Sequence, residues 1–190
     1  VKVGDKVFTD SDNGNINSEK RVHKVFVDKD TLDNACEYTI KFARCIRRKP
    51  YFAESGETFE KTYSFKPLNK RDDINIYMIC DSHSQTAEPA KSGKYFGDKL
   101  DTLVLNGDIP DHSGNIDNLL SIYYITSEVT KGGVPVIYAR GNHDTRGEIA
   151  PEFANYVATD KGNLYYTFRI GSIWGVVLDC VEDKNDDHPE

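Results

Sequence analysis

Residues 74–83 read INIYMICDSH, a short apolar run that ends abruptly in polar side chains. The same change occurs twice more, in TLVLNGD at residues 102–108 and in VPVIYARGNHD at residues 134–144. Apolar runs of this length are typical of buried strands. Between the second and third runs, residues 115–129 carry apolar side chains with the i, i+3, i+4, i+7 spacing of an amphipathic helix. Strands that alternate with a helix in this way predict parallel pairing and an α/β fold.

The region before these runs has a different pattern. Residues 36–47 alternate between two faces with near-strict period two, and residues 58–65 alternate again. Both stretches predict half-buried strands, with a turn between them at residues 54–57. Residues 21–27 predict an earlier strand. This part of the chain is therefore expected to be an all-β region.

A polar and charged break over residues 66–73 predicts a domain boundary. It divides the chain into a β domain over residues 1–70 and an α/β domain over residues 71–190. Near the end of the second domain, two further apolar stretches predict a strand pair that turns at Gly171.

The charge of the 190-residue chain is −7, and it is unevenly distributed. Residues 1–70 carry 14 basic and 11 acidic residues, whereas residues 71–190 carry 10 basic and 20 acidic residues. A chain this acidic lacks the basic surface that sequence-independent nucleic-acid binding needs, so no nucleic-acid partner is expected. No run approaches the ~18 apolar residues of a membrane helix. The first ten residues, VKVGDKVFTD, lack the basic and then apolar pattern of a signal peptide.

The polar groups that follow the three apolar runs combine into one ligand set. The carboxyl ends of parallel strands meet at one edge of a sheet, so the three loops are expected to lie together. Two carboxylates, an imidazole and an amide oxygen form a mixed O/N set that suits Mn, Fe or Zn. Each motif alone also fits a solvated loop, a turn or a helix cap. Their occurrence in order, each after an apolar run, favours a metal site made of Asp81, His83, Asp108 and Asn142, beside His143 and Asp144.

Asp81-x-His83, Gly107-Asp108 and Gly141-Asn142-His143-Asp144 resemble the first three motifs of the calcineurin-like metallophosphoesterases. A β region ahead of such a domain resembles the layout of the purple acid phosphatases. Leu32 and Tyr38, six residues apart before a strand, resemble the tyrosine corner of a fibronectin type III sandwich. The resemblance implies an incomplete α/β metallophosphoesterase sandwich of βαβ units, preceded by part of a small fibronectin type III-like β-sandwich.

The same resemblance implies a role for each residue of the motifs. Asp81 and His83 bind one metal ion, Asp108 bridges two divalent or trivalent ions, and Asn142 binds the second. His143 lies near the leaving group and acts as general acid, with Asp144 supporting it. The residues agree with this role, because an imidazole donates a proton near neutral pH.

Two features depart from the family pattern. Purple acid phosphatases carry a metal-binding tyrosine three residues after the bridging aspartate, where this chain has Asp111. The family also completes its site with a further His and a closing Gly-His-x-His. After His143 the sequence contains only His188, which is interpreted as part of a solvated acidic tail. The chain is therefore expected to be a piece of a longer protein, with too few ligands for the second ion.

Two functions remain open at this point. The first is a metal-dependent phosphoesterase, in which a hydroxide bridging two ions attacks a phosphomonoester or phosphodiester substrate. The second is a non-catalytic adhesion or binding module with a degenerate metal site.

Overall fold

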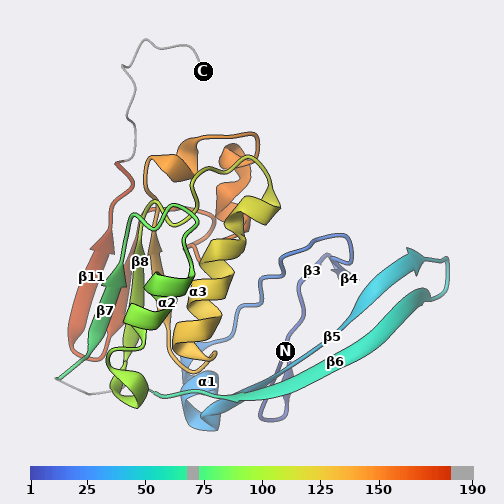
Figure 1. Ribbon diagram of the computed structural model, residues 1–190. Helices are drawn as coiled ribbons and strands as arrows, with labels where there is room; N and C mark the ends of the chain where they lie inside the picture. The colour runs from blue at the N-terminus through green and yellow to red at the C-terminus, as the bar shows by residue number, and fades with distance from the viewer. Residues whose placement is uncertain (68–72, 181–190) are drawn as a thin grey trace. The chain divides into compact units, whose positions relative to one another are not determined.

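The computed structural model describes residues 1–67 and 73–180. The chain divides into two compact units, Val1–Pro67 and Leu68–Glu190 (Figure 1). The break predicted at residues 66–73 falls mostly on residues 68–72, outside the described residues, as does His188. None of the helices in the described ranges combines the length and apolar character that crossing a membrane requires.

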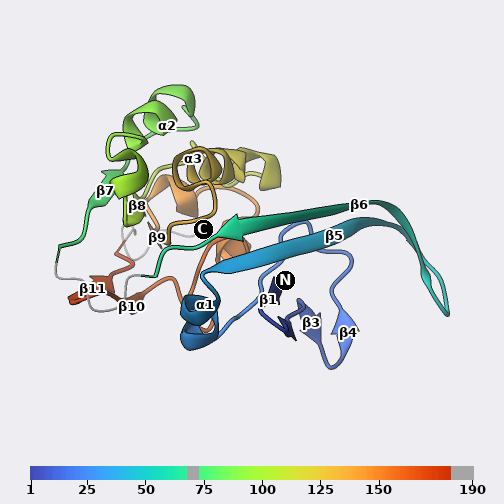
Figure 2. The ribbon, with the colours of Figure 1, turned by 90° about the horizontal axis from the view of Figure 1, so that it is seen from below.

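The first unit is an antiparallel β structure with one short helix. Its main sheet has the order β2-β1-β5-β6, in which β5 and β6 form a long hairpin (Figure 2). A smaller hairpin joins β3 to β4. The bounds are β1 (Lys2–Val3), β2 (Lys6–Val7), β3 (Ser11–Asp12), β4 (Asn15–Ile16), α1 (Lys29–Ala35), β5 (Glu37–Arg48) and β6 (Ala53–Ser64).

Two local predictions for this unit are wrong. Residues 21–27 form no strand. The turn between β5 and β6 lies before Ala53, where the N–H of Lys49 donates to the carbonyl of Phe52 at 3.0 Å. Pro50 explains the position, because proline favours the second position of a turn and cannot pair inside a sheet. Residues 54–57, predicted as the turn, belong to β6.

The tyrosine-corner residues also have defined places. Leu32 lies in α1, which the carboxylate of Asp28 caps by accepting the N–H of Thr31 at 2.8 Å. Tyr38 lies in β5 and stacks on Tyr63 of β6, with ring centroids 5.3 Å apart.

The second unit confirms the α/β prediction. Its central sheet is parallel, with the order β7-β8-β9 (Figure 1). Helix α2 follows β7 and helix α3 follows β8, so each parallel pair has a helical connection. The bounds are β7 (Ile76–Ile79), α2 (Ala87–Gly93), β8 (Thr102–Asn106), α3 (Leu120–Thr130) and β9 (Val136–Ala139). The predicted strand pair is also confirmed, as β10 (Tyr166–Ile170) and β11 (Ile173–Val177).

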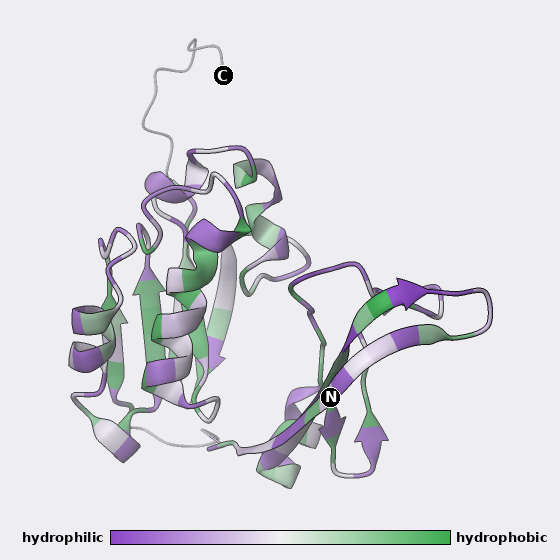
Figure 3. Ribbon diagram, turned by 45° about the vertical axis from the view of Figure 1, so that its right-hand side comes forward, coloured by the Kyte–Doolittle hydropathy of each residue, from purple (hydrophilic) through white to green (hydrophobic). Residues whose placement is uncertain are grey.

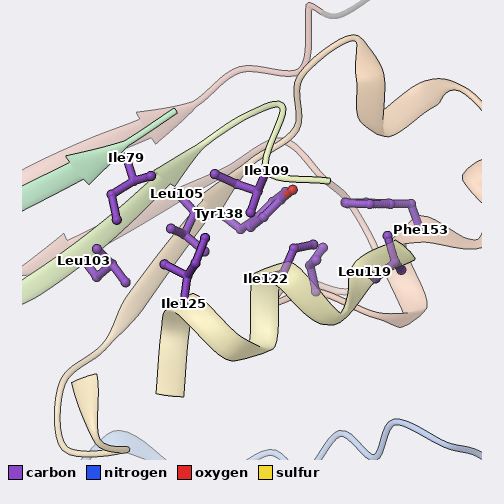
Figure 4. Packing of buried hydrophobic residues seen from close by; sticks show 10 residues of the cluster. Ile79, Leu103, Leu105, Ile109, Leu119, Ile122, Ile125, Tyr138 and Phe153 are labelled. Carbon is purple, nitrogen blue, oxygen red and sulfur yellow. The ribbon is translucent and has the colours of Figure 1, made fainter. Parts of the chain in front are cut away.

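The core of this unit lies between the sheet and α3. Leu103 and Leu105 of the central strand β8 are fully buried, which explains its continuous apolar run. Hydrophobic residues concentrate on the sheet and on α3 (Figure 3). The cluster, drawn in Figure 4, is Ile79, Leu103, Leu105, Ile109, Leu119, Ile122, Ile125, Tyr138, Phe153 and Val157.

Short 3-10 helices complete the unit. Asn115 caps the turn that leads into α3, because its side chain accepts the N–H groups of Asp117 and Asn118. The 3-10 helices are η1 (Gly97–Lys99), η2 (Ile116–Leu119), η3 (His143–Thr145) and η4 (Ala150–Asn155).

Candidate metal centre

The loops that follow β7 and β8 are bound to each other through their backbones. The N–H of Asp81 donates to the carbonyl of Gly107 at 3.1 Å, and the N–H of His83 donates to the carbonyl of Asp108 at 3.0 Å. The N–H of Ser84 continues the series by donating to Ile109 at 2.8 Å. These bonds extend the pairing of two parallel strands beyond their ends, so the two polar motifs lie side by side.

Three ligand candidates in these loops have a backbone conformation that is rare for residues with a side chain. The φ angles are +53° for Asp81, +44° for His83 and +53° for Asp108. Such left-handed conformations cost on the order of 1–2 kcal/mol each. They persist where surrounding bonds hold them, and they cluster at functional sites.

The side chains of Asp81, His83 and Asp108 converge. Each offers one ligand atom, and these atoms all lie within 4.8 Å of one another. Asp108 is 8% exposed, whereas Asp81 faces solvent. Two carboxylates and an imidazole in this arrangement fit a transition-metal ion with mixed O/N ligands. His83 also belongs to a second group of this kind, with Asp111 and His143, whose ligand atoms lie within the same distance of one another.

The loop after β9 joins this group through the backbone. The N–H of His143 donates to the Asp108 carboxylate at 2.9 Å. Gly141 permits this approach, because a side chain there would collide with the same carboxylate. Asn142 lies between Gly141 and His143 in the sequence, and its carbonyl accepts the N–H of Thr145 at 3.2 Å. Its predicted role as a ligand of the second ion stays a prediction.

Asp144 is fully buried and links two of the loops. One carboxylate oxygen accepts the N–H of Gly141 at 2.6 Å and the N–H of Asp108 at 3.3 Å. The other oxygen accepts the hydroxyl of Tyr138 at 3.1 Å. Burial is the main cause that raises the pKa of this carboxyl to about 6. Asp144 thus supports the His143 loop through backbone groups.

The imidazole of His143 has other partners. Its Nδ1 lies 2.7 Å from the carbonyl oxygen of Asp111, and its Nε2 lies 2.9 Å from Nη1 of Arg146. A carbonyl only accepts and a guanidinium only donates, so Nδ1 carries the hydrogen and Nε2 accepts. The carboxylate of Asp111 lies 3.7 Å from the same Nδ1 and 3.5 Å from Nδ1 of His83. The rings of His83 and His143 are nearly perpendicular, with centroids 4.3 Å apart.

The sequence reasoning missed the contributions of Asp111, Arg146 and Tyr138. The sequence does indicate Asp111 as a site residue, because a carboxylate three residues after Asp108 falls on the same loop. Arg146 follows His143 by three residues, which is one turn of the 3-10 helix η3. Tyr138 carries a hydroxyl inside an apolar run, and a buried hydroxyl needs a hydrogen-bond partner. His112, from the same loop as Asp111, accepts the N–H of Gly114 at 3.1 Å and thereby shapes that loop.

The chain was compared with protein-family models, curated proteins and solved structures. A sequence model of the calcineurin-like phosphoesterase family matches residues 74–185, more than half of the chain, including all three loops. Among solved structures, the chain is similar to a purple acid phosphatase isolated from seeds of yellow lupin (Lupinus luteus). The TM-score is 0.46 at 15% sequence identity, and the match covers 74% of this chain and 29% of that chain. No curated protein matches. The chain belongs to the calcineurin-like phosphoesterases.

Proposed function

We propose that this chain carries the metal-binding and proton-donating part of a phosphoesterase that hydrolyses a phosphomonoester or a phosphodiester. The observation that carries the proposal is one contact. The N–H of His143 binds the Asp108 carboxylate at 2.9 Å, within a group that also contains Asp81 and His83. The ring of His143 also lies with its centroid 4.3 Å from that of His83, so an imidazole able to act as a proton donor lies directly beside these metal ligands.

The donor set fits a metal ion. Asp81, His83 and Asp108 would hold one ion, and Asp108 with Asn142 would contribute to a second, with Mn, Fe or Zn as the candidates. When bound, such ions supply the positive charge that neutralises phosphoryl oxygens and makes water acidic enough to act as a nucleophile near neutral pH. Without that charge, Asp81, Asp108 and Asp111 repel a phosphate, so binding of the ester depends on metal.

Hydrogen bonds hold both the carboxylate and the backbone of Asp108. Its Oδ1 accepts the N–H of His143, and its own N–H donates to Asp144. The hydrogen bond to Oδ1 restricts rotation of the carboxylate and leaves its second oxygen as the candidate metal ligand. A carboxylate with one oxygen held by the protein loses little freedom on binding a cation.

His143 is held for proton transfer at one nitrogen. The carbonyl of Asp111 binds Nδ1 at 2.7 Å, which fixes the ring and leaves Nε2 as the reactive atom. In the structure Nε2 accepts from Arg146, so it would first take a proton from solvent in place of that hydrogen bond, and the imidazolium would then pass this proton to the oxygen of the departing alcohol. General acid catalysis of this kind contributes about 10²–10⁴-fold.

The test is hydrolysis of a nitrophenyl phosphate and of the matching bis-nitrophenyl phosphate, with and without Mn²⁺, Fe²⁺ or Zn²⁺. We expect slow, metal-dependent release of nitrophenol that Asp108→Asn lowers by about 10²-fold or more. Asp98→Asn, on η1, is the matched control and should match the wild type. Metal-independent turnover would contradict the proposal. Bound metal without turnover on either ester would favour the non-catalytic binding module.

A further inference from the structure

We propose that Arg146 is a substrate-binding residue, whose guanidinium leaves Nε2 of His143 and binds a phosphoryl oxygen when a phosphate ester enters. The inference rests on the proposed function and adds to it a residue outside the three motifs. It starts from the hydrogen bond of 2.9 Å that Nη1 of Arg146 donates to Nε2 of His143.

That hydrogen bond occupies the position that the leaving group needs. Nδ1 of His143 is held by the Asp111 carbonyl, so Nε2 is the nitrogen that, once protonated, is able to donate to a departing oxygen. An oxygen that takes a proton from Nε2 must lie about 2.6–3.2 Å from it. Nη1 of Arg146 already lies at that distance. Ester binding and the Arg146–His143 contact therefore exclude each other, and the guanidinium must move to a new partner.

The backbone of Arg146 stays fixed while its side chain moves. Its carbonyl accepts the N–H of Ser113 at 2.6 Å, and its N–H donates to the carbonyl of His143 at 3.2 Å. The next residue, Gly147, has a φ of +124°, and a Cβ there would lie 2.4 Å from the backbone of Ser113. The side chain of Arg146 is exposed. Only the flexible stem and the guanidinium are therefore able to respond to a ligand.

The charge of Arg146 suits a phosphoryl group. The carboxylates of Asp81, Asp108 and Asp111 surround the site, and Arg146 brings a permanent positive charge to it. A planar guanidinium binds two phosphate oxygens at once, which a point charge does not. Arg140 follows β9 as well, and its guanidinium binds the carboxylate of Asp179 through two hydrogen bonds of 3.1 and 2.7 Å. Arg146 is the arginine whose guanidinium contacts the ring of His143.

The experiment measures binding of inorganic phosphate to the zinc-loaded chain by calorimetry. Arg146→Gln should weaken phosphate binding about 10- to 100-fold, since hydrogen bonds to a charged group are lost. The phosphate affinity of Arg146→Lys should lie between those of the wild type and Arg146→Gln, because lysine keeps the charge and lacks the planar guanidinium. Arg169→Gln is the matched control, since Arg169 lies over the ring of Trp174 in the β10–β11 hairpin and should bind phosphate like the wild type. Bound zinc is measured for every variant and should be equal.

The outcomes separate this proposal from the function on which it rests. Equal phosphate affinity in Arg146→Gln and the wild type would overturn the role of Arg146 and leave the proposed function standing. A wild-type chain that binds zinc but no phosphate would overturn both. Loss of zinc in Arg146→Gln would also overturn the substrate-binding role of Arg146, since the weaker phosphate binding would then result from the missing metal. In turnover of a nitrophenyl phosphate, Arg146→Gln should raise KM more than it lowers kcat, and an unchanged KM would contradict the proposal.

Discussion

The hydroxyl of Tyr138 donates a hydrogen bond of 3.1 Å to the carboxylate of Asp144, and the two residues are 3% and 0% exposed. The second oxygen of that carboxylate holds backbone N–H groups of Gly141 and Asp108. One buried carboxylate therefore links strand β9 to the two loops that carry His143 and Asp108. Burial, followed by the charge of Asp144, raises the pKa of Tyr138 well above its usual range, so its hydroxyl remains a donor.

Tyr138→Phe should lower the free energy of unfolding by about 1–3 kcal/mol, because it leaves a buried carboxylate oxygen without its donor. Urea unfolding followed by circular dichroism measures the change. Tyr124→Phe is the matched control, since Tyr124 lies on α3 and is 50% exposed. Equal unfolding free energies for the two variants would show that the Tyr138–Asp144 bond does not stabilise the loops.

The buried Asp144 carboxyl should give the metal-free chain a characteristic pH dependence. Its pKa is raised from 3.8 to about 6, so the folded state holds the proton more tightly than the unfolded state. The free energy of unfolding should therefore fall as pH rises from about 4 to about 6, by at most about 3 kcal/mol, and level off above.

Asp144→Asn removes this titration. The amide oxygen still accepts the two backbone N–H groups, and the amide nitrogen can donate to the hydroxyl of Tyr138. The difference between wild-type and variant unfolding free energies should change across this pH window, whereas Asp98→Asn should follow the wild type. An identical slope in wild type and Asp144→Asn would contradict the assignment to Asp144.

His143→Ala should slow turnover without removing metal. The loss on an alkyl phosphate should reach about 10²–10⁴-fold, and it should be smaller on a nitrophenyl phosphate, whose leaving group needs no proton. The comparison is of kcat for the two esters at saturating metal. His23→Ala is the matched control, because His23 lies in the first unit, where its Nδ1 is 3.1 Å from the carboxylate of Asp10. Equal losses on both esters would remove His143 from the acid role, and lost metal would make it a ligand.

The strands and the loops of the second unit could be predicted because they depend on local sequence. Strands β7, β8 and β9 are continuous apolar runs, and polar residues follow each of them directly. Parallel pairing then brings those residues to one edge. The hairpin β10–β11 could be predicted from local sequence as well, since the turn between its strands contains Gly171, which has a φ of +58°.

Other features depend on contacts that sequence spacing does not encode. The partner of the His143 ring is the Asp111 carbonyl, 32 residues away, and the choice between Asp111 and Asp144 is made by how the loops pack. Helix α2 has only seven residues and includes Pro89, so it has no long apolar stripe. The turn before β6 differs from the prediction because residues 54–57 also have a turn-like composition, whereas Pro50 sets the actual bend.

The central claim is that Asp81, His83 and Asp108 form a metal site, and calorimetric titration of the metal-free chain with Zn²⁺ or Mn²⁺ tests it most directly. The wild type should bind metal, and Asp98→Asn should bind it equally well. Asp108→Asn should weaken binding by about 10²-fold or more, because it removes the charged ligand shared by the loops. No binding by the wild type, or equal affinity in the wild type and Asp108→Asn, would contradict the claim.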